Sequence, residues 1–185
     1  MRTFIAIELE DKLKEQLCLF IQELMSVSQN IKWVKKQGMH LTLKFLGDID
    51  QAKTRGIQSS LDKTAKETEA FSLQIKGTGA FPPGKRNPRV LWVGVTESTP
   101  LHKLQAEIES GCERLGFPRE RRAFHPHLTL GRLKESSDLG GVLSLLEKNR
   151  EVPFGEMTVR KITFFQSLLK PTGAEYRVLS EFDLR

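Results

Sequence analysis

The sequence has few cysteines and no long apolar run. Its 185 residues include two cysteines, Cys18 and Cys112, which lie far apart and form no CxxC pair. This argues against a disulfide scaffold and against a thiolate metal site, and the apolar helix-like surroundings of each cysteine predict a buried thiol. No segment approaches the roughly 20 apolar residues that a membrane-spanning helix needs, so we expect no membrane partner.

A secretory signal pattern is also missing at the N-terminus. The apolar residues of segment 2–7 give way to charge at Glu8 instead of continuing as an apolar run. We therefore expect a reduced, cytoplasmic protein.

Composition and charge are those of a globular protein with a basic surplus. The chain is 38% hydrophobic and 28% charged, which fits one soluble domain over residues 1–185 and leaves no room for two full-sized ones. It has 29 Lys and Arg against 23 Asp and Glu, with a net charge of +6 and a pI near 9.4. That surplus favours a polyanionic partner, nucleic acid above all. Nothing indicates an obligate oligomer, and we expect a monomer.

Hydrophobic periodicity predicts interleaved strands and helices. Strands are expected at 2–8, 31–34, 40–46, 71–75, 89–95, 127–133, 157–166 and 176–184, and helices at 11–28, 50–68, 101–115 and 139–148. A loop is expected at 77–88 and a turn at 170–173. This interleaving favours an α/β or α+β domain over a helical bundle or a sandwich.

One tetrapeptide occurs twice. His40-Leu41-Thr42-Leu43 and His127-Leu128-Thr129-Leu130 are identical, and each lies in a predicted strand. Taken alone, an HxT strand indicates a half-buried histidine and a β-favouring threonine. At ordinary residue frequencies, HLTL occurs by chance in a chain of this length well under about 1% of the time. The pair therefore indicates two similar halves with a functional role.

Alternation along a strand places the histidine and the threonine of each tetrapeptide on one face, roughly 6 to 7 Å apart at their Cα atoms, and the leucines on the other. If the two halves face each other, two imidazoles and two hydroxyls line one cleft. In-line displacement at phosphorus needs a base on one side and an acid on the other. An unperturbed pKa near 6.5 lets one histidine be neutral and the other protonated near neutrality.

These residues and their surroundings resemble the two-histidine (2H) phosphoesterase superfamily, and within it the bacterial and archaeal RNA 2′,3′-cyclic phosphodiesterases, long called 2′-5′ RNA ligases. The resemblance covers nearly the whole chain. Its segments, in order, are Arg2-Thr3-Phe4-Ile5-Ala6-Ile7, Trp33-Val34, His40-Leu41-Thr42-Leu43-Lys44-Phe45-Leu46-Gly47, Gly79-Ala80-Phe81-Pro82, Pro88-Arg89-Val90-Leu91-Trp92-Val93-Gly94, His125-Pro126-His127-Leu128-Thr129-Leu130-Gly131-Arg132 and Pro171-Thr172-Gly173-Ala174-Glu175-Tyr176.

The resemblance implies an α+β fold of two pseudo-symmetric lobes, each a mainly antiparallel sheet flanked by helices, around a central cleft. It implies that His40 donates a proton to the leaving ribose 3′-oxygen and that His127 accepts one from water, giving a 2′-phosphomonoester. Thr42 and Thr129 would hold the phosphate. Run in reverse with an RNA 5′-hydroxyl, the site would make a 2′-5′ linkage. The family needs no metal or nucleotide cofactor. Gly131 replaces an alanine that many members have.

Three nearby residues are candidate substrate contacts. Lys44 lies two residues after Thr42, on the same face of an ideal strand, where it would meet a phosphate or stand as a solvated edge lysine. In an ideal strand Arg132 points to the face opposite Thr129, so it reaches the phosphate only if the strand ends or bulges at Gly131. Phe81 would stack on a base or pack within its loop.

Two alternative functions stay open. An RNA-end-binding module would use the same cleft without turnover. A zinc hydrolase would use His40, His125 and His127, because His125 shares a face with His127 in an ideal strand. Otherwise His125, which precedes a proline, is a supporting or exposed residue and a candidate substrate contact.

Two basic loops are candidates for following an RNA backbone. One contains Lys85, Arg86 and Arg89, and the other contains Arg119, Arg121 and Arg122. The alternative for both is solvated surface.

Overall fold

Two antiparallel sheets form the framework of the computed structural model, which describes residues 1–84, 88–171 and 173–185 and no side chains at 135–138. Sheet A has the order β3 (His40–Asp48), β1 (Arg2–Glu8), β8 (Lys161–Lys170), β9 (Gly173–Asp183). Sheet B has the order β2 (Gln29–Trp33), β6 (His127–Asp138), β5 (Val90–Val95), β4 (Phe71–Phe81), β7 (Pro153–Val159). The strands that carry the two tetrapeptides thus belong to different sheets.

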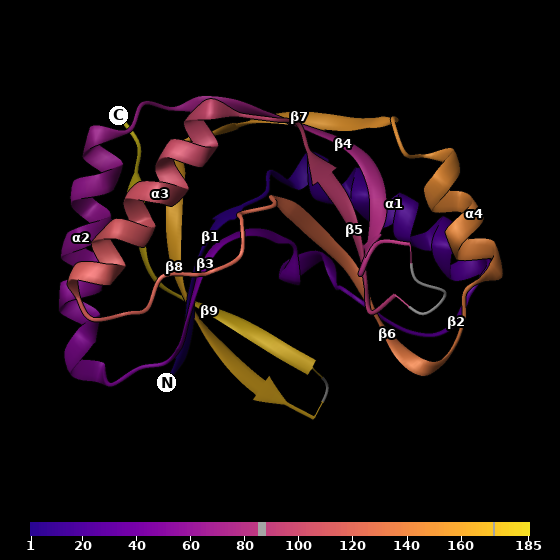
Figure 1. Cartoon of the computed structure of the whole chain (residues 1–185), viewed down its shortest axis with the longest axis horizontal. Helices are drawn as coiled ribbons and strands as arrows, with labels where there is room; N and C mark the ends of the chain where they lie inside the picture. The colour runs from indigo at the N-terminus through magenta and orange to yellow at the C-terminus, as the bar shows by residue number, and fades with distance from the viewer. Residues whose placement is uncertain (85–87, 172) are drawn as a thin grey trace.

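Two helices cover one face of each sheet (Figure 1). Sheet A is covered by α2 (Thr54–Glu67) and α3 (Thr99–Arg114), and sheet B by α1 (Asp11–Ser26) and α4 (Gly140–Lys148). The helices form because their apolar residues recur on one stripe, such as the buried Leu13, Leu17 and Leu24 of α1. Short 3₁₀ turns precede β3 and α2, at Lys36–Gly38 and Gln51–Lys53. No helix of the described part is long and apolar enough to cross a membrane.

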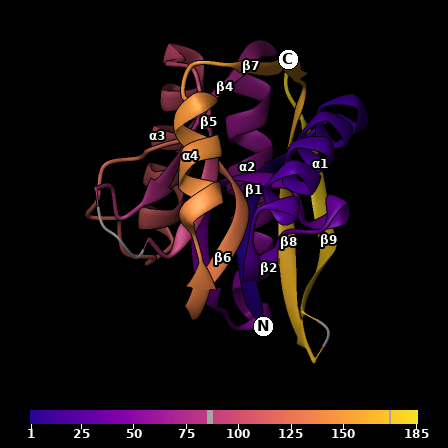
Figure 2. The same ribbon diagram turned by 90° about the vertical axis from the view of Figure 1, so that its right-hand side faces the viewer.

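The chain passes between the sheets several times. It places β1 in sheet A, β2 in sheet B, β3 in sheet A, β4 to β7 in sheet B, and β8 and β9 in sheet A. One continuous apolar cluster joins both sheets and all four helices. The two halves expected from the repeat are therefore present as two lobes, but they are interleaved along the sequence. Figures 1 and 2 show the β8–β9 hairpin projecting from the body, at the end away from the C-terminus.

Three predicted boundaries are wrong. The strand expected at 157–166 is two strands, β7 and β8, separated at Arg160, because they belong to different sheets. β4 continues to Phe81 through the predicted loop, and a register shift between Ile75 and Thr78 accommodates Gly77, whose φ is 78°. β6 runs to Asp138 rather than ending at 133, because it pairs with β2 along its length.

Gly79 makes room for a large ring on β5. A Cβ at this position would overlap the indole of Trp92, which pairs with Thr129 on β6. We expect Gly79→Ala to lower the free energy of unfolding by about 1–3 kcal/mol through overpacking, as measured by urea denaturation. Ser72→Ala, at an exposed position of the same strand, is the control. A Gly79→Ala protein as stable as the control would contradict this reading of the packing.

Candidate active site

Both tetrapeptides carry the same irregularity. In β3, Thr42 pairs with Ala6 and Lys44 with Ile5, so Leu43 is an extra, bulged residue. In β6, Thr129 pairs with Trp92 and Gly131 with Leu91, so Leu130 is the extra residue. The last leucine of each HLTL therefore forms a β-bulge, which reverses the side-chain alternation of the residues that follow. Below, the side of each sheet that carries its HxT residues is called the site face.

The bulge overturns both readings of Lys44. Since Leu43 is the extra residue, Lys44 points away from Thr42, toward the helices that cover sheet A. Its Nζ lies 2.6 Å from Oε2 of Glu109 on α3 and donates to the carbonyl of Pro118 at 3.1 Å. Only 4% of the side chain is exposed. Lys44 is thus neither a phosphate contact nor a solvated edge residue.

The corresponding bulge brings Arg132 to the site face. Arg132 pairs with Val90, which shares a face with Trp92, and Trp92 pairs with Thr129. The arginine therefore lies on the same face as His127 and Thr129, with its side chain exposed. The positive charge of Arg132 contributes to lowering the pKa of the His127 imidazole. The sequence predicts that Arg132 reaches the site only if the strand ends or bulges at Gly131. The strand does bulge, but the extra residue is Leu130.

His40 rests in a small aromatic cluster at the start of β3. Its ring lies 4.7 Å from that of Phe4 and 5.0 Å from that of Tyr176, which meets it edge-on (ring centroids). Phe4, Ala6 and Phe165 form a cluster of their own on this side of sheet A, with Tyr176 packed against it. A pocket beside the imidazole is lined by Glu8, Gln37, Met39, His40, Phe165, Tyr176 and Val178. Packing on fixed rings limits the orientations of the imidazole.

His127 has an equivalent setting in sheet B. The ring of Phe81 meets it edge-on, with ring centroids 5.0 Å apart, and Phe81 also lies against Trp92 at 5.3 Å. Phe81 therefore supports the histidine, and its stacking on a base stays a prediction.

Backbone carbonyls hold both imidazoles. Nδ1 of His127 lies 2.7 Å from the carbonyl oxygen of His125. Because a carbonyl only accepts, Nδ1 carries the proton and Nε2 is the free nitrogen. His40 makes a backbone hydrogen bond with Gly38, also two residues earlier. These carbonyl contacts leave no side-chain signature, so the sequence does not reveal them. His125 supports its neighbour through its backbone, while its side chain is exposed.

Burial lowers the pKa of His40 to about 4. The hydrogen bond with Gly38 opposes this shift, as does the negative charge of Glu8, which pairs with His40 across the sheet. Lys14, ion-paired with Glu8 at 2.9 Å, lowers the pKa further. His40 is therefore neutral near pH 7 in the free protein.

Burial also lowers the pKa of His127. The bond with His125 opposes the shift, and the positive charge of Arg132 adds to it. Both imidazoles are thus disfavoured as cations in the free protein, so neither has the unperturbed pKa near 6.5 that was expected from the sequence.

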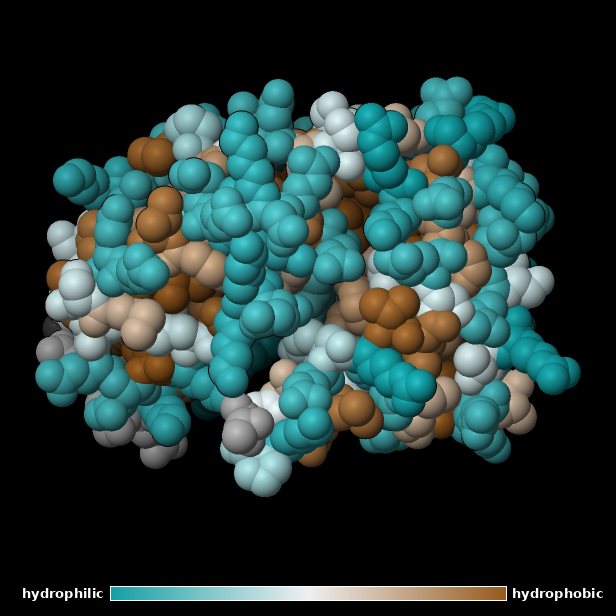
Figure 3. Space-filling model, turned by 180° about the vertical axis from the view of Figure 1, so that it is seen from behind, coloured by the Kyte–Doolittle hydropathy of each residue, from teal (hydrophilic) through white to brown (hydrophobic). Residues whose placement is uncertain are grey.

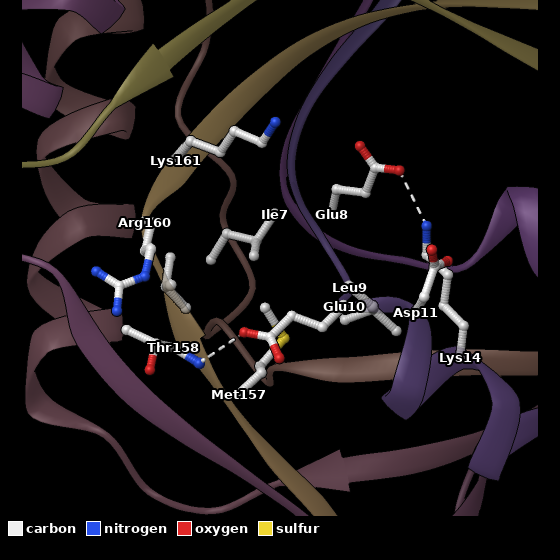
Figure 4. Close-up of a pocket in the computed structure, with 11 residues that line it drawn as sticks. Ile7, Glu8, Leu9, Glu10, Asp11, Lys14, Met157, Thr158, Arg160 and Lys161 are labelled. Carbon is white, nitrogen blue, oxygen red and sulfur yellow. Dashed lines mark hydrogen bonds and ion pairs between the residues drawn. The ribbon is translucent and has the colours of Figure 1, made fainter.

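The fold brings the two strands that carry the tetrapeptides close to each other. Cα atoms of β3 and β6 approach within 8 Å although the strands belong to different sheets. Two imidazoles and two half-buried threonines thus lie on neighbouring strands. The larger pocket of Figure 4 lies next to this region, between the end of β1 and the β7–β8 crossover. Glu8 lines it, whereas neither histidine does, and its Glu8 and Glu10 are already bonded to Lys14 and to the backbone N–H of Thr158.

The predicted metal-ligand set is not assembled. Among the described residues, no three His, Cys, Asp or Glu side chains gather as a metal ion requires, so His40, His125 and His127 do not form the site of the zinc alternative.

The second basic loop contains two ion-paired arginines. Arg119 lies 2.9 Å from Glu113, and Arg122 lies 3.2 Å from Glu120, so two arginines of the second loop are paired. In the first loop, Lys85 and Arg86 lie outside the described residues, and Arg89 is exposed.

The face of the molecule shown in Figure 3 is mostly hydrophilic, with apolar residues gathered in patches.

Comparisons with known proteins agree with this arrangement. The family model described as the 2'-5' RNA ligase superfamily matches residues 13–170. A relative from Thermotoga maritima named RNA 2',3'-cyclic phosphodiesterase is 37% identical over 181 residues, which cover 98% of this chain and 94% of the relative.

Solved structures share the fold over their whole length. TT0787 of Thermus thermophilus superposes with a TM-score of 0.86 at 28% identity, covering 100% of this chain and 98% of that one. E. coli LigT, crystallised in complex with 3'-AMP, superposes with a TM-score of 0.80 at 24% identity, covering 99% and 97%. The α+β architecture of two antiparallel sheets flanked by helices is thereby confirmed.

Proposed function

Because the chain belongs to the 2'-5' RNA ligase superfamily, we propose that it hydrolyses 2′,3′-cyclic phosphate ends of RNA, or small cyclic nucleotides, to 2′-phosphomonoesters. Its relatives named RNA 2',3'-cyclic phosphodiesterase, which it matches over nearly their full length, support this substrate class. The carrying observation is the pair of HxT strands, which come from different sheets and approach within 8 Å at their Cα atoms, each with a backbone contact to its histidine.

Each histidine takes one proton-transfer role. His127, with Nδ1–H held by a carbonyl, presents Nε2 as the acceptor for a proton from the attacking water. His40 donates to the leaving ribose 3′-oxygen. Thr42 and Thr129 donate hydrogen bonds to the non-bridging oxygens, and the Arg132 guanidinium offsets the charge that builds on them.

The assignment of acid and base follows the family resemblance. Burial lowers the pKa of both imidazoles, to about 4 for His40, so these shifts do not select the acid. Glu8, cross-strand from His40, opposes the shift there, whereas Lys14 adds to it, and Arg132 adds to the shift at His127.

The same groups would also catalyse ligation. An RNA 5′-hydroxyl in place of water, deprotonated by His127, would attack the cyclic phosphate; the bond from phosphorus to the 3′-oxygen would break, His40 would protonate that oxygen, and the product would have a 2′-5′ linkage. A binding module without turnover is the competing function.

Hydrolysis is tested by mixing the protein with cytidine 2′,3′-cyclic phosphate and following the product by ³¹P NMR, with and without a chelator. We expect cytidine 2′-monophosphate, formed at the same rate in the chelator. Tight binding without product would favour the binding module. Formation of cytidine 3′-monophosphate would show that the ribose 2′-oxygen, and not the 3′-oxygen, is the leaving group.

Anion binding is expected to be coupled to proton uptake. The lowered pKa of each histidine leaves it neutral at pH 7, and a bound anion raises that pKa. Binding then tightens as pH falls from about 8 to 5, up to about tenfold per unit for each proton taken up. Calorimetry with inorganic sulfate, whose charge is constant over this range, measures the effect. His40→Ala and His127→Ala should each flatten the profile, and an unchanged slope in both would contradict the coupling.

A further inference from the structure

Lys32 and Arg132 lie directly opposite each other on neighbouring strands of sheet B. Lys32 belongs to the edge strand β2 and pairs with Arg132 of β6. Directly paired residues of antiparallel strands point to the same face, so Lys32 shares the site face with Arg132. Both side chains are exposed. Two cations therefore stand side by side on the face that carries the second HxT motif.

The neighbours of Lys32 fix this orientation. Ile31 and Trp33, one residue before it and one after it, pack against the main apolar core. Trp33 pairs with Gly131, and a Cβ at that glycine would lie 2.8 Å from the indole. Alternation along β2 then leaves Lys32 on the opposite face, away from the helices. The lysine is thus directed to the site face by the packing of its neighbours.

This pair of cations has no balancing charge within the chain. Like charges directly opposite each other destabilise a sheet. The exposed Lys161 at the other sheet is balanced, because its Nζ lies 2.6 Å from a carboxylate oxygen of Glu181. Among the side chains that the structure describes, no carboxylate lies within ion-pair distance of Lys32 or Arg132. An anion from outside the protein would remove the repulsion.

The position of the pair indicates which anion this is. Arg132 lies one step along β6 beyond Thr129, about 7 Å from it, and Lys32 lies one strand further out, about 5 Å from Arg132. The path from the proposed position of the cyclic phosphate to Lys32 therefore runs past Arg132. In an RNA strand one ribose separates the terminal phosphate from the next one. The second phosphate of an RNA end thus fits the position of Lys32.

We propose that Lys32, beside Arg132, binds the phosphodiester that links the terminal nucleotide to the rest of an RNA strand. This inference rests on the proposed function and narrows its substrate class. An RNA end carries this phosphodiester, whereas a free cyclic mononucleotide does not. The contact is made to the backbone, so it favours RNA ends without selecting a sequence.

The test compares three substrates that differ at this phosphate. Cytidine 2′,3′-cyclic phosphate lacks it, the 5′-phosphorylated form of the same nucleotide adds the phosphate alone, and the dinucleotide UpC with a 2′,3′-cyclic end contains the phosphodiester. Lys32→Gln should lower kcat/KM about 3- to 10-fold for the second and third substrates and leave the first unchanged. Lys32→Arg should retain activity on all three.

Two further measurements separate a phosphate contact from a structural role. For the dinucleotide, Lys32→Gln should reduce the slope of log kcat/KM against log salt by about 0.7, the value for one phosphate contact on a single strand. Its melting temperature in low salt should not fall, because the substitution removes a like-charge contact. Lys103→Gln is the control, since it removes an exposed lysine of α3, which covers the other face of sheet A, and it should change no rate.

Two results would overturn the inference: an equal loss on substrates with and without the phosphate, and no loss on any of them. The first would assign Lys32 to the cyclic phosphate or to packing, and the second to solvated surface. If the wild-type protein hydrolyses none of the three substrates, the proposed function fails instead. Binding of the same three compounds then decides, because Lys32→Gln should still weaken binding of the two that carry the phosphate, and equal binding contradicts the contact.

Discussion

His127→Ala and His40→Ala are each expected to lower kcat for cytidine 2′,3′-cyclic phosphate about 10²- to 10⁴-fold, the usual contribution of one positioned acid or base. The wild-type protein should show a bell-shaped pH profile, because one histidine acts as a base and the other as an acid. Each variant should lose the limb that belongs to the missing group. Steady-state kinetics between pH 5 and 9 measure both effects.

Two other histidines are the controls. His102, on α3, lies against Phe124 and is not part of the site, so His102→Ala should have wild-type kinetics. His125→Ala removes an imidazole next to the site but keeps the carbonyl that holds His127, so it should lose far less than His127→Ala. Wild-type rates in either His40→Ala or His127→Ala would end the acid–base account.

Lys44→Met is expected to lower the free energy of unfolding by about 3–5 kcal/mol, because it leaves the Glu109 carboxylate buried without its partner. The two side chains are 4% and 10% exposed, and their charged atoms lie 2.6 Å apart. Urea denaturation measures the loss.

A second variant separates charge from packing. Lys44→Met combined with Glu109→Leu removes both charges and should recover most of the lost stability, since apolar residues often replace a buried pair without cost. Lys66→Met breaks an exposed pair with Asp62, whose side chains are 72% and 50% exposed, and should change stability by no more than about 1 kcal/mol. A Lys44→Met protein as stable as Lys66→Met would show that the ion pair is not needed.

The repeated tetrapeptide is sufficient to predict where the chemistry lies, because alternation in a strand places His and Thr on one face whatever the rest of the fold does. The same alternation gives the wrong face for Lys44, the residue that follows the first tetrapeptide. A β-bulge at Leu43 has no mark in the sequence, so simple alternation places Lys44 on the wrong face. The identical bulge at Leu130 has the opposite effect and brings Arg132 to the site. The bulge that both tetrapeptides share becomes visible only when the pairing of each strand with its neighbour is known.

Helices are predictable because their apolar stripes are a local property of the sequence. The distribution of strands between sheets is not, since it depends on pairing partners far away in the chain. The join at Arg160 shows this, where β7 of sheet B passes directly into β8 of sheet A within what reads as one apolar strand. The aromatic support of His40 escapes prediction for the same reason, because Phe4 and Tyr176 come from opposite ends of the sequence.

The central claim is that His40 is the acid and His127 the base. A cyclic substrate with sulfur in place of the ribose 3′-oxygen tests it most directly, because a thiolate, with a pKa near 8.5, leaves without a proton. On this substrate His40→Ala should regain most of the activity that it loses on the oxygen substrate, whereas His127→Ala should stay impaired. Rescue of His127→Ala instead, or of neither variant, would contradict the assignment.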